Sequence, residues 1–424
     1  MAKPYVTLLG KSIKKLAGLR GGGSALPGLV IEKIDPQFVS RTLTQLPRGV
    51  VIVSGTNGKT TTTKMVVELF ESQGLKVFTN RTGSNFVRGV IAALLGEIDV
   101  HGQLDADIAV LELDEAHAVH FVRAVTPRYS LLLNVMRDQL DRFGEIDTTA
   151  RMLAAVASAT SQKVVINRED PRLLALGKKL PVEKTAYFGL SPSLRTLFPS
   201  DENLRSDDKP ATAPPSLPKA VCTLNALHDH TATFSLNGKS STATLKLDGI
   251  YNIFNAAAAL ALVSEVMAKQ LNRTALLATV SQIAPAFGRG ETVMVNEQPV
   301  ELVLVKNPSG FRLGLKSFSP SGCATMIAIN DNYADGRDMS WLWDVDFDSL
   351  RQEGVAMISG IRAYDMALRL QYDEVTISEI ELNLADALKQ FLAFDAPKRI
   401  YCTYTAMLTL RRELSKITEV ESVK

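Results

Sequence analysis

The run Ser-Gly-Thr-Asn-Gly-Lys-Thr-Thr-Thr at 54–62 constrains the fold most, because of what stands on either side of it. The β-branched residues 50–53 before it predict a buried strand, and residues 60–72 after it have helical spacing. In a strand, glycine-rich turn and helix of this kind, backbone N–H groups and the helix N-terminus point at one place, where an anion binds. The run therefore predicts a phosphate-binding loop within an α/β fold.

The following segments repeat the same alternation of strand and helix. Further apolar runs lie at 76–79, 108–113, 129–134 and 163–167. Near-continuous apolar strands separated by helices indicate a parallel sheet that is covered on both faces. Short alternating strands are expected at 221–247, and an Ala-rich helix at 252–267.

The length of 424 residues suggests about three units at roughly 150 residues each. We expect an N-terminal segment at 1–45, a central domain at 46–297 and a C-terminal α/β domain at 298–424. The expected strands of the last unit lie at 300–305, 324–330, 355–359 and 399–402, with a helix over 380–392 between the last two. Residues 191–220 are rich in Ser, Pro and Asp, which predicts a loop or a locally disordered insert.

The charge balance excludes one class of function. The chain has 47 basic and 45 acidic residues, a net charge of +2, which argues against a nucleic-acid protein that binds by bulk charge. No stretch approaches 18 uncharged apolar residues, so no transmembrane segment is expected. The N-terminal basic residues predict a solvated helix face, with contact to an anionic surface left open: Lys3, Lys11, Lys14, Lys15 and Arg20.

Cysteine usage indicates a reducing compartment. The three cysteines, Cys222, Cys323 and Cys402, lie about 80 and 100 residues apart, too far for a local metal-binding knuckle.

The residues of the 54–62 run suit nucleotide phosphates. Small residues let the backbone approach an anion, Lys59 would neutralise the β- and γ-phosphates, and Thr60 or Thr61 would hold Mg²⁺. Val53 departs from the general pattern, which has glycine at that position. The alternative is an ordinary turn that contains Gly-Lys-Thr, and the flanking strand and helix favour nucleotide binding.

Acids at the end of the 108–113 strand are the second motif. Ligands bind at the carboxyl ends of strands in such sheets, and a carboxylate there can ligate the Mg²⁺ that bridges phosphates. Glu112, Asp114 and Glu115 are the acids at this place, and a solvated strand end is the alternative.

Three more polar motifs follow along the chain. Asn134 opens the run Asn-Val-Met-Arg-Asp-Gln-Leu-Asp-Arg, which ends at residue 142. Asn252 and Asn255 share one helix face, either as nucleotide contacts or with Asn252 as a helix cap. The stretch 331–344 holds both tryptophans of the chain together with the acids Asp331, Asp335, Asp338 and Asp344, which is typical of a site or an interface.

These motifs, in this order, resemble the Mur ligase family of ATP-dependent peptidoglycan amide ligases. Four details resemble the MurT branch of that family, the synthetase subunits of lipid II isoglutaminyl synthases: the segments 80–85, 287–291, 306–308 and 404–407. The resemblance implies a Mur-ligase-like central domain with a phosphate loop and a parallel sheet, plus a Rossmann-like C-terminal domain.

The resemblance also implies a reaction. ATP would phosphorylate the α-carboxyl of D-glutamate in lipid II, and ammonia would displace the phosphate to give D-isoglutamine. Ammonia would come from a GatD-type glutaminase in a heterodimer, in the cytoplasm or at the inner face of the membrane. An aspartate of this chain would complete the glutaminase's Cys–His pair, with Asp335 favoured over Asp331 and Asp338.

Matching positions supply the implied site residues. Glu112 is the expected Mg²⁺ ligand, with Thr60 beside it and Glu115 a close second. The positions that match the family's nucleotide site are Gly55, Thr56, Asn57, Gly58, Lys59, Thr60, Thr61, Asn252, Asn255 and Arg289.

The sequence departs from the family pattern at two places, and both concern metal binding. Amino-acid-adding members have a carbamylated lysine where 148–155 offers only Arg151, and a metal-binding histidine where Gln139 stands. Many MurT proteins carry a four-cysteine zinc ribbon where this chain has the 191–220 insert, so we expect no zinc.

Two alternatives to the amidation reaction remain open. One is an amino-acid ligase like folylpolyglutamate synthase, and the other is a non-catalytic nucleotide-binding scaffold that activates a glutaminase.

Overall fold

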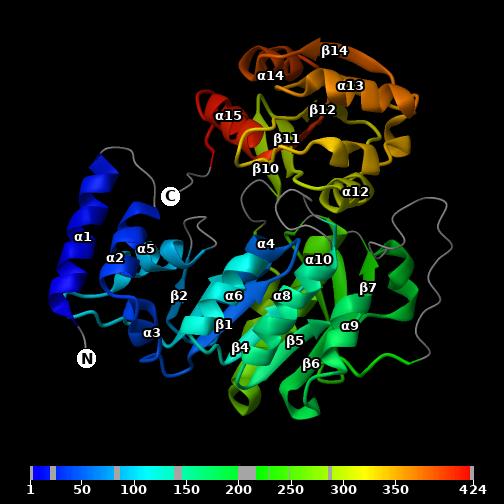
Figure 1. The fold of residues 1–424 in the computed structure, drawn as a ribbon. Helices are drawn as coiled ribbons and strands as arrows, with labels where there is room; N and C mark the ends of the chain where they lie inside the picture. Colours follow the sequence, from blue (N-terminus) through cyan, green and yellow to red (C-terminus); the bar gives the residue numbers. More distant parts are fainter. Residues whose placement is uncertain are drawn as a thin grey trace.

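The computed structural model describes residues 3–19, 25–80, 86–137, 146–198, 216–228, 230–247, 249–284 and 289–420. They form two α/β units, each built on its own sheet, with a group of N-terminal helices at one side (Figure 1).

The first sheet has nine strands in the order β2-β3-β1-β4-β5-β6-β7-β8-β9. The strands from β2 to β7 pair in parallel, and β8 and β9 are added antiparallel. This arrangement confirms the parallel sheet expected from the apolar runs. The strands are β1 Val50–Ser54, β2 Val77–Thr79, β3 Ile108–Glu112, β4 Tyr129–Leu132, β5 Lys163–Asn167, β6 Thr185–Leu190, β7 Cys222–His228, β8 Thr231–Leu236 and β9 Lys239–Thr244.

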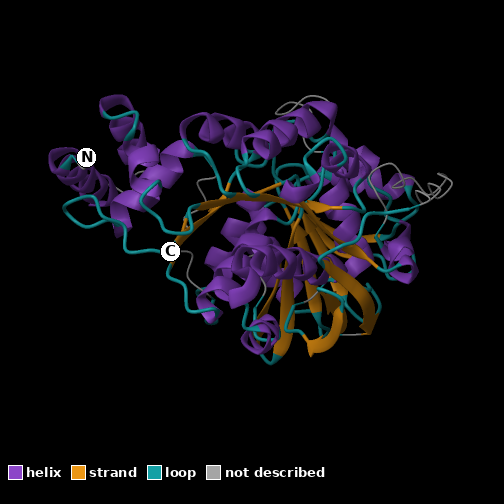
Figure 2. Cartoon of the chain, turned by 90° about the horizontal axis from the view of Figure 1, so that it is seen from below, coloured by secondary structure: helices purple, strands orange, loops and turns teal. Residues whose placement is uncertain are grey.

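Helices cover both faces of this sheet, because its central strands are apolar on both sides; all five residues of β1 are buried. One face carries α4 Lys59–Ser72, α10 Ile250–Met267 and α11 Arg273–Val280. The other carries α5 Val87–Glu97, α6 Glu115–Ala124, α8 Ile146–Ala159 and α9 Pro171–Gly177. Figure 2 shows the strands between helices.

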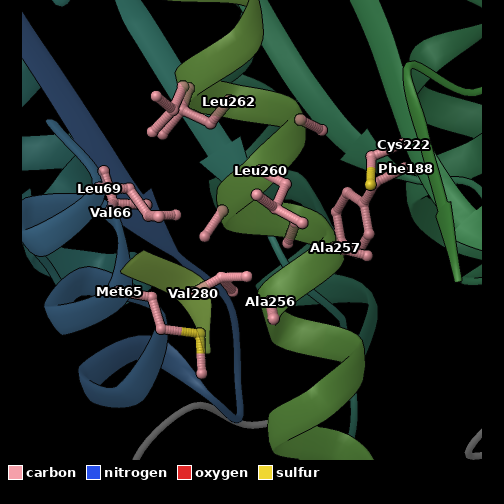
Figure 3. Close-up of a cluster of buried hydrophobic side chains, with 14 of the residues drawn as sticks. Met65, Val66, Leu69, Phe188, Cys222, Ala256, Ala257, Leu260, Leu262 and Val280 are labelled. Atoms are coloured by element: carbon pink, nitrogen blue, oxygen red, sulfur yellow. The ribbon is translucent and has the colours of Figure 1, made fainter. Parts of the chain in front are cut away.

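Helix α10 lies in the centre of one hydrophobic core. Met65, Val66 and Leu69 of α4 face Ala256 and Leu260 of α10 in this core (Figure 3). Alanines on α10 let the two helices approach closely. Among the described helices, the segment Ile250–Gln270 is the one apolar and long enough to cross a membrane, and 78% of its apolar window is buried inside the protein. It is therefore a core helix, at the place where the Ala-rich pattern predicted a helix.

The second sheet has six strands in the order β10-β11-β15-β12-β13-β14, all parallel except the β10–β11 hairpin. Hydrophobic clusters fill both faces. The strands are β10 Arg289–Val295, β11 Gln298–Leu304, β12 Ala324–Ala328, β13 Val355–Ser359, β14 Ile377–Glu381 and β15 Lys398–Cys402, and the helices are α12 Pro308–Ser317, α13 Ala363–Tyr372, α14 Leu384–Leu392 and α15 Tyr404–Leu414.

One expectation for this unit differs from the structure. The helix expected over 380–392 begins only at Leu384, because Ile377–Glu381 pairs with β13 and Asn383 caps the helix by accepting from the Ala385 N–H at 2.9 Å. The expected domain boundary after residue 297 falls inside the β10–β11 hairpin, so we propose that the C-terminal unit begins by Arg289.

The remaining described elements are an N-terminal group of helices and several 3-10 turns. The N-terminal group is α1 Pro4–Leu19, α2 Ala25–Ile34 and α3 Phe38–Leu43. The 3-10 turns are η1 Val182–Lys184, η2 Pro192–Leu197, η4 Ala268–Gln270, η5 Ser340–Asp344 and η6 Asp348–Leu350. Most of the predicted insert at 191–220 lies outside the described residues.

Candidate functional site

The glycine-rich loop lies between β1 and α4, at the carboxyl edge of the first sheet. Gly58 precedes the first helical residue with a φ of +86°, a conformation that favours glycine. A Cβ at Gly58 would also lie 2.6 Å from the side-chain nitrogen of Asn255. The loop therefore brings its backbone close to α10, which a larger residue at this position would prevent.

Lys59 is buried at the start of α4, with only 5% of the residue exposed. Its Nζ donates to the carbonyl oxygen of Gly55 at 2.7 Å and lies 3.1 Å from Asp114 Oδ1 and 3.7 Å from Glu115 Oε2. A buried ammonium group is stable only with such partners. The arrangement keeps a cation inside the loop where phosphate oxygens could replace or supplement the carboxylates.

Thr60 and Glu112 form the second polar pair. The Thr60 hydroxyl donates to Glu112 Oε1 at 2.8 Å across the end of β3. Asn80 fixes this strand end: its side chain donates to the Glu112 carbonyl at 2.8 Å and accepts from the Glu112 N–H at 3.0 Å. One hydroxyl and one carboxylate, together with phosphate oxygens, are a common protein contribution to Mg²⁺ binding.

A cavity of about 130 Å³ adjoins the loop, between the two sheets. Asn57, Gly58 and Thr61 line it from the loop, and Asn252 and Asn255 line it from α10. Five residues that the sequence predicted to bind nucleotide, from two motifs far apart in the chain, thus line one cavity. Gly249, and not Asn252, is the N-cap of α10, so the capping alternative for Asn252 is wrong.

Two buried polar atoms of this cavity have no hydrogen-bond partner among the described residues: the hydroxyls of Thr61 and Tyr251. Burial raises the pKa of Tyr251, so its hydroxyl stays protonated and available as a donor. Native proteins rarely leave buried polar atoms unsatisfied. The two hydroxyls fit a polar ligand such as a nucleotide.

Residues of the second unit also contact the loop, and the sequence motifs had not predicted them as site residues. Asn57 and Asn307 exchange side-chain amide hydrogen bonds, at 3.4 Å and 3.2 Å. Lys306 donates from Nζ to the Thr56 carbonyl at 3.2 Å. Asn307 also caps α12 by accepting from the Gly310 N–H at 2.7 Å. The signal in the sequence was the Lys-Asn-Pro run after a strand, which marks a capped helix.

Asn134, which follows β4, holds the glycine-rich loop through hydrogen bonds to its backbone. It accepts from the Asn57 N–H and donates to the Asn57 carbonyl, both at 2.9 Å. The next residue, Val135, donates its N–H to Asp170 Oδ2 at 2.7 Å. Asp170 also caps α9 through Leu173, and burial raises the pKa of its carboxyl to about 6.

The acidic stretch after β12 has a different structure. Asp335 is buried and accepts from the Thr405 N–H at 2.7 Å, the Thr405 hydroxyl at 2.6 Å and the Asn332 N–H at 3.1 Å. Burial raises the pKa of Asp335, although these hydrogen bonds pull it down. Asp331 pairs with Arg362 at 2.8 Å.

The other acids of this stretch also have partners. Asp338 accepts from the Ser340 N–H at 2.9 Å. Farther along, Asp344 lies 3.4 Å from Arg137, in the segment that follows β4. The stretch therefore touches the first unit, while its early part folds against α15.

Some sequence-based residues cannot be placed in the site. Only the backbone of Arg289 is described, at the start of β10, and Gln139 lies outside the described residues. Arg151 is exposed on α8 and donates to Thr148 at 2.9 Å. No group of three or more potential metal ligands occurs in the described part of the chain, and the absence of zinc stays a prediction.

Comparisons with known proteins cover nearly the whole chain. The family model of the Mur ligase middle domain matches residues 53–263, and that of the MurT ligase C-terminal domain matches residues 304–407. The MurT subunit of the glutamine-hydrolysing lipid II isoglutaminyl synthase from Streptococcus pneumoniae is 30% identical over 96% of both chains. The subunit of that name from Staphylococcus aureus strain COL is 26% identical over 98% of both.

Solved structures agree on the fold. The MurF ligase of Thermotoga maritima, solved with ADP, superposes with a TM-score of 0.65 over 90% of this chain and 84% of that one. The sequence identity is 15%, so this match shows only that the fold is similar.

Proposed function

Because this chain belongs to the family of MurT subunits of lipid II isoglutaminyl synthases, we propose that it amidates the α-carboxyl of D-glutamate in lipid II at the expense of ATP. Membership makes the chain a subunit of an ATP-dependent ligase. The observation that carries the proposal is the buried Lys59 together with the Thr60–Glu112 pair, directly after the glycine-rich loop. That loop lines the inter-sheet cavity through Asn57 and Gly58.

The residues of this site have separable roles. The backbone of Gly55 to Gly58 would cradle the phosphates, and Lys59 would shift from Asp114 and Glu115 towards them. Thr60 and Glu112 would hold Mg²⁺, which supplies charge neutralisation when bound. Thr61, Tyr251 and the two asparagines of α10 line the space left for the remainder of the nucleotide.

The proposed chemistry has two steps. A carboxylate oxygen of D-glutamate attacks the γ-phosphorus of ATP, ADP leaves, and an acyl phosphate forms. Ammonia then attacks the acyl carbon, the carbon–oxygen bond to phosphate breaks, and one proton is released with inorganic phosphate. The first step replaces a poor leaving group with a good one, and the protein contributes position and charge.

A partner must supply ammonia, and we propose a GatD-type glutaminase. Hydrolysis of glutamine needs a reactive thiolate with a base. Burial raises the pKa of all three cysteines here, which favours the thiol over the thiolate that such a nucleophile needs. The aspartate that completes the partner's Cys–His pair is proposed among Asp331, Asp335 and Asp338. With a lipid-linked substrate, the proposed place of action is the cytoplasm at the inner face of the membrane.

Supply of free ammonia tests the ligase half alone. Purified chain with ATP, Mg²⁺, ammonium and lipid II should give amidated lipid II and one inorganic phosphate per amide. Incorporation of glutamate in place of ammonia would establish the amino-acid ligase alternative. Nucleotide binding without turnover, in the presence of the glutaminase, would establish the scaffold alternative.

A further inference from the structure

The outer face of helix α1 is apolar. Tyr5, Leu8, Leu9 and Leu16 are exposed by 66%, 52%, 43% and 63%. At 3.6 residues per turn these four side chains fall within an arc of about 100°. Such a stripe normally faces a core, whereas here it faces outward.

The opposite face of α1 holds the helix against the protein. Val6 is buried, and a Cβ at Gly10 would lie 2.5 Å from the side chain of Leu95 on α5. Helix α1 contacts both α2 and α5 and lies at one extreme of the molecule (Figure 1). The direction of the apolar stripe is therefore set by packing on the other side.

The charged residues of α1 itself are all basic, although acids of other elements lie near two N-terminal lysines: Asp35 pairs with Lys3 at 3.3 Å, and Glu97 lies near Lys14. Residues 1–31 contain five basic residues and no Asp or Glu, and the first acid of the chain is Glu32. The whole chain carries a net charge of only +2, so the rest of it is net negative. Lys11 and Lys15 lie on α1 along one border of the stripe, where their ammonium groups can reach past the exposed leucines.

A second exposed stripe, on α13, provides a contrast. Tyr364, Leu368 and Tyr372 are exposed by 66%, 48% and 70%. Acids and arginines alternate around them: Asp365 pairs with Arg362, and Asp373 pairs with Arg369. Mixed charge suits a protein surface, whereas leucines bordered by lysines without acids suit anionic lipid.

We propose that the outer face of α1 binds the surface of an anionic phospholipid bilayer. The leucines and Tyr5 enter the boundary between headgroups and acyl chains, and Lys11 and Lys15 contact lipid phosphates. The helix lies in the plane of the surface and does not span it. The proposal is independent of the ligase reaction, and a lipid-linked substrate, as named for the relatives, gives such a contact a use.

Vesicle co-sedimentation of the full chain tests the proposal. We expect binding to phosphatidylcholine vesicles with about 30% phosphatidylglycerol, and at least about tenfold weaker binding to pure phosphatidylcholine or at high salt. Leu8→Ser combined with Leu16→Ser should weaken binding about tenfold or more. Leu368→Ser on α13 is the matched control and should bind like the wild type. Lys11→Glu with Lys15→Glu should remove the preference for the anionic lipid.

A second readout protects the test from a folding artefact. Tyr5→Trp should show a blue shift of its emission with anionic vesicles, and amidation of lipid II in detergent micelles should be unchanged in the Leu8/Leu16 variant. Equal vesicle binding by the Leu8/Leu16 variant and the wild type would overturn the proposal. So would concentration-dependent dimerisation that this variant abolishes, because the stripe would then be an interface between copies of the chain.

Discussion

The two sheets end in loops that use buried charge in opposite ways. After β1, the buried Lys59 lies beside the carboxylates of Asp114 and Glu115. These two acids follow a different strand, β3. After β12, the buried Asp335 accepts three hydrogen bonds from Asn332 and Thr405. The first loop holds a charge whose partners can change when an anion arrives. The second holds a charge whose partners fix the shape of the loop.

The largest expected effect comes from Lys59→Ala. Loss of the ammonium removes phosphate neutralisation and leaves Asp114 and Glu115 facing each other without a cation, so amidation should fall by about 10³-fold or more with either ammonia or glutamine. Initial rates of phosphate release and of amide formation measure it. Lys64→Ala on the same helix, which removes a surface pair with Glu68, is the control and should retain activity. Ammonia-driven turnover that survives in Lys59→Ala would remove the basis of the proposed function.

Glu112→Gln should have the next largest effect. The amide can still accept from Thr60 but no longer offers a negative charge to Mg²⁺, so turnover should fall about 10- to 100-fold and need more Mg²⁺. Glu115→Gln should cost less, because Asp114 remains beside Lys59 at 3.1 Å. Mg²⁺ titrations of the rate separate the two. If Glu115→Gln shifts the Mg²⁺ dependence more than Glu112→Gln, the metal ligand is misassigned.

Substitutions in the acidic stretch 331–344 should affect glutamine-driven turnover more than ammonia-driven turnover. Asp335→Asn should lower glutamine-driven turnover about tenfold and spare ammonia-driven turnover. Thr405→Val removes a hydrogen bond from the same carboxylate and leaves its charge. If Asp335 acts by shaping the loop, Thr405→Val should reproduce the loss. If its charge reaches the glutaminase, Thr405→Val should be milder.

Asp331→Asn and Asp338→Asn complete this series of variants. Asp331 is 21% exposed and lies beside Arg362, so its carboxylate can reach a partner without rearrangement of the loop. A selective loss of glutamine-driven turnover in Asp331→Asn or Asp338→Asn, with Asp335→Asn near wild type, would transfer the role to that residue. Equal loss of both activities in Asp335→Asn would place it outside the glutaminase function.

Much of the first sheet and its loop followed from local sequence. Periodicity and the glycine-rich run predicted the strands from β1 to β5 and the helix at Lys59, because these features depend on neighbouring residues. The pairing of Thr60 with Glu112 was expected only as two ligands of one metal: Glu112 ends β3, and Thr60 lies in the first turn of α4, after the neighbouring strand β1.

Contacts between the sheets could not be predicted in this way. Asn57 and Asn307 are 250 residues apart, and no periodicity relates them. The same holds for Asp335 and Thr405, whose hydrogen bonds depend on the adjacency of β12 and β15 in the sheet order. Residues after neighbouring strands of a parallel sheet meet at one edge, but the order of strands is a tertiary property that a single sequence does not specify.

The smallest effect on turnover should come from Asp170, which corresponds in the first sheet to Asp335 in the second. Each buried aspartate ties a loop to the start of a helix. Burial raises the pKa of Asp170 from 3.8 to about 6, so the folded state binds a proton more tightly than the unfolded state. Stability from this group is complete below pH 3.8 and is lost as the pH rises through about 6.

Asp170→Asn should therefore flatten the pH dependence of stability between pH 4 and 7 by about 3 kcal/mol, since one pKa unit corresponds to about 1.4 kcal/mol. Urea unfolding at several pH values measures this slope, and the loss of one hydrogen bond in the variant adds only a constant offset. The exposed Asp147→Asn is the control and should keep the wild-type slope. A wild-type slope in Asp170→Asn would mean that the backbone N–H groups of Val135 and Leu173 outweigh burial and hold this aspartate ionised. In that case Asp170 would resemble Asp335, a buried carboxylate whose hydrogen-bond donors fix the shape of its loop, and would differ from Lys59, whose partners are charged.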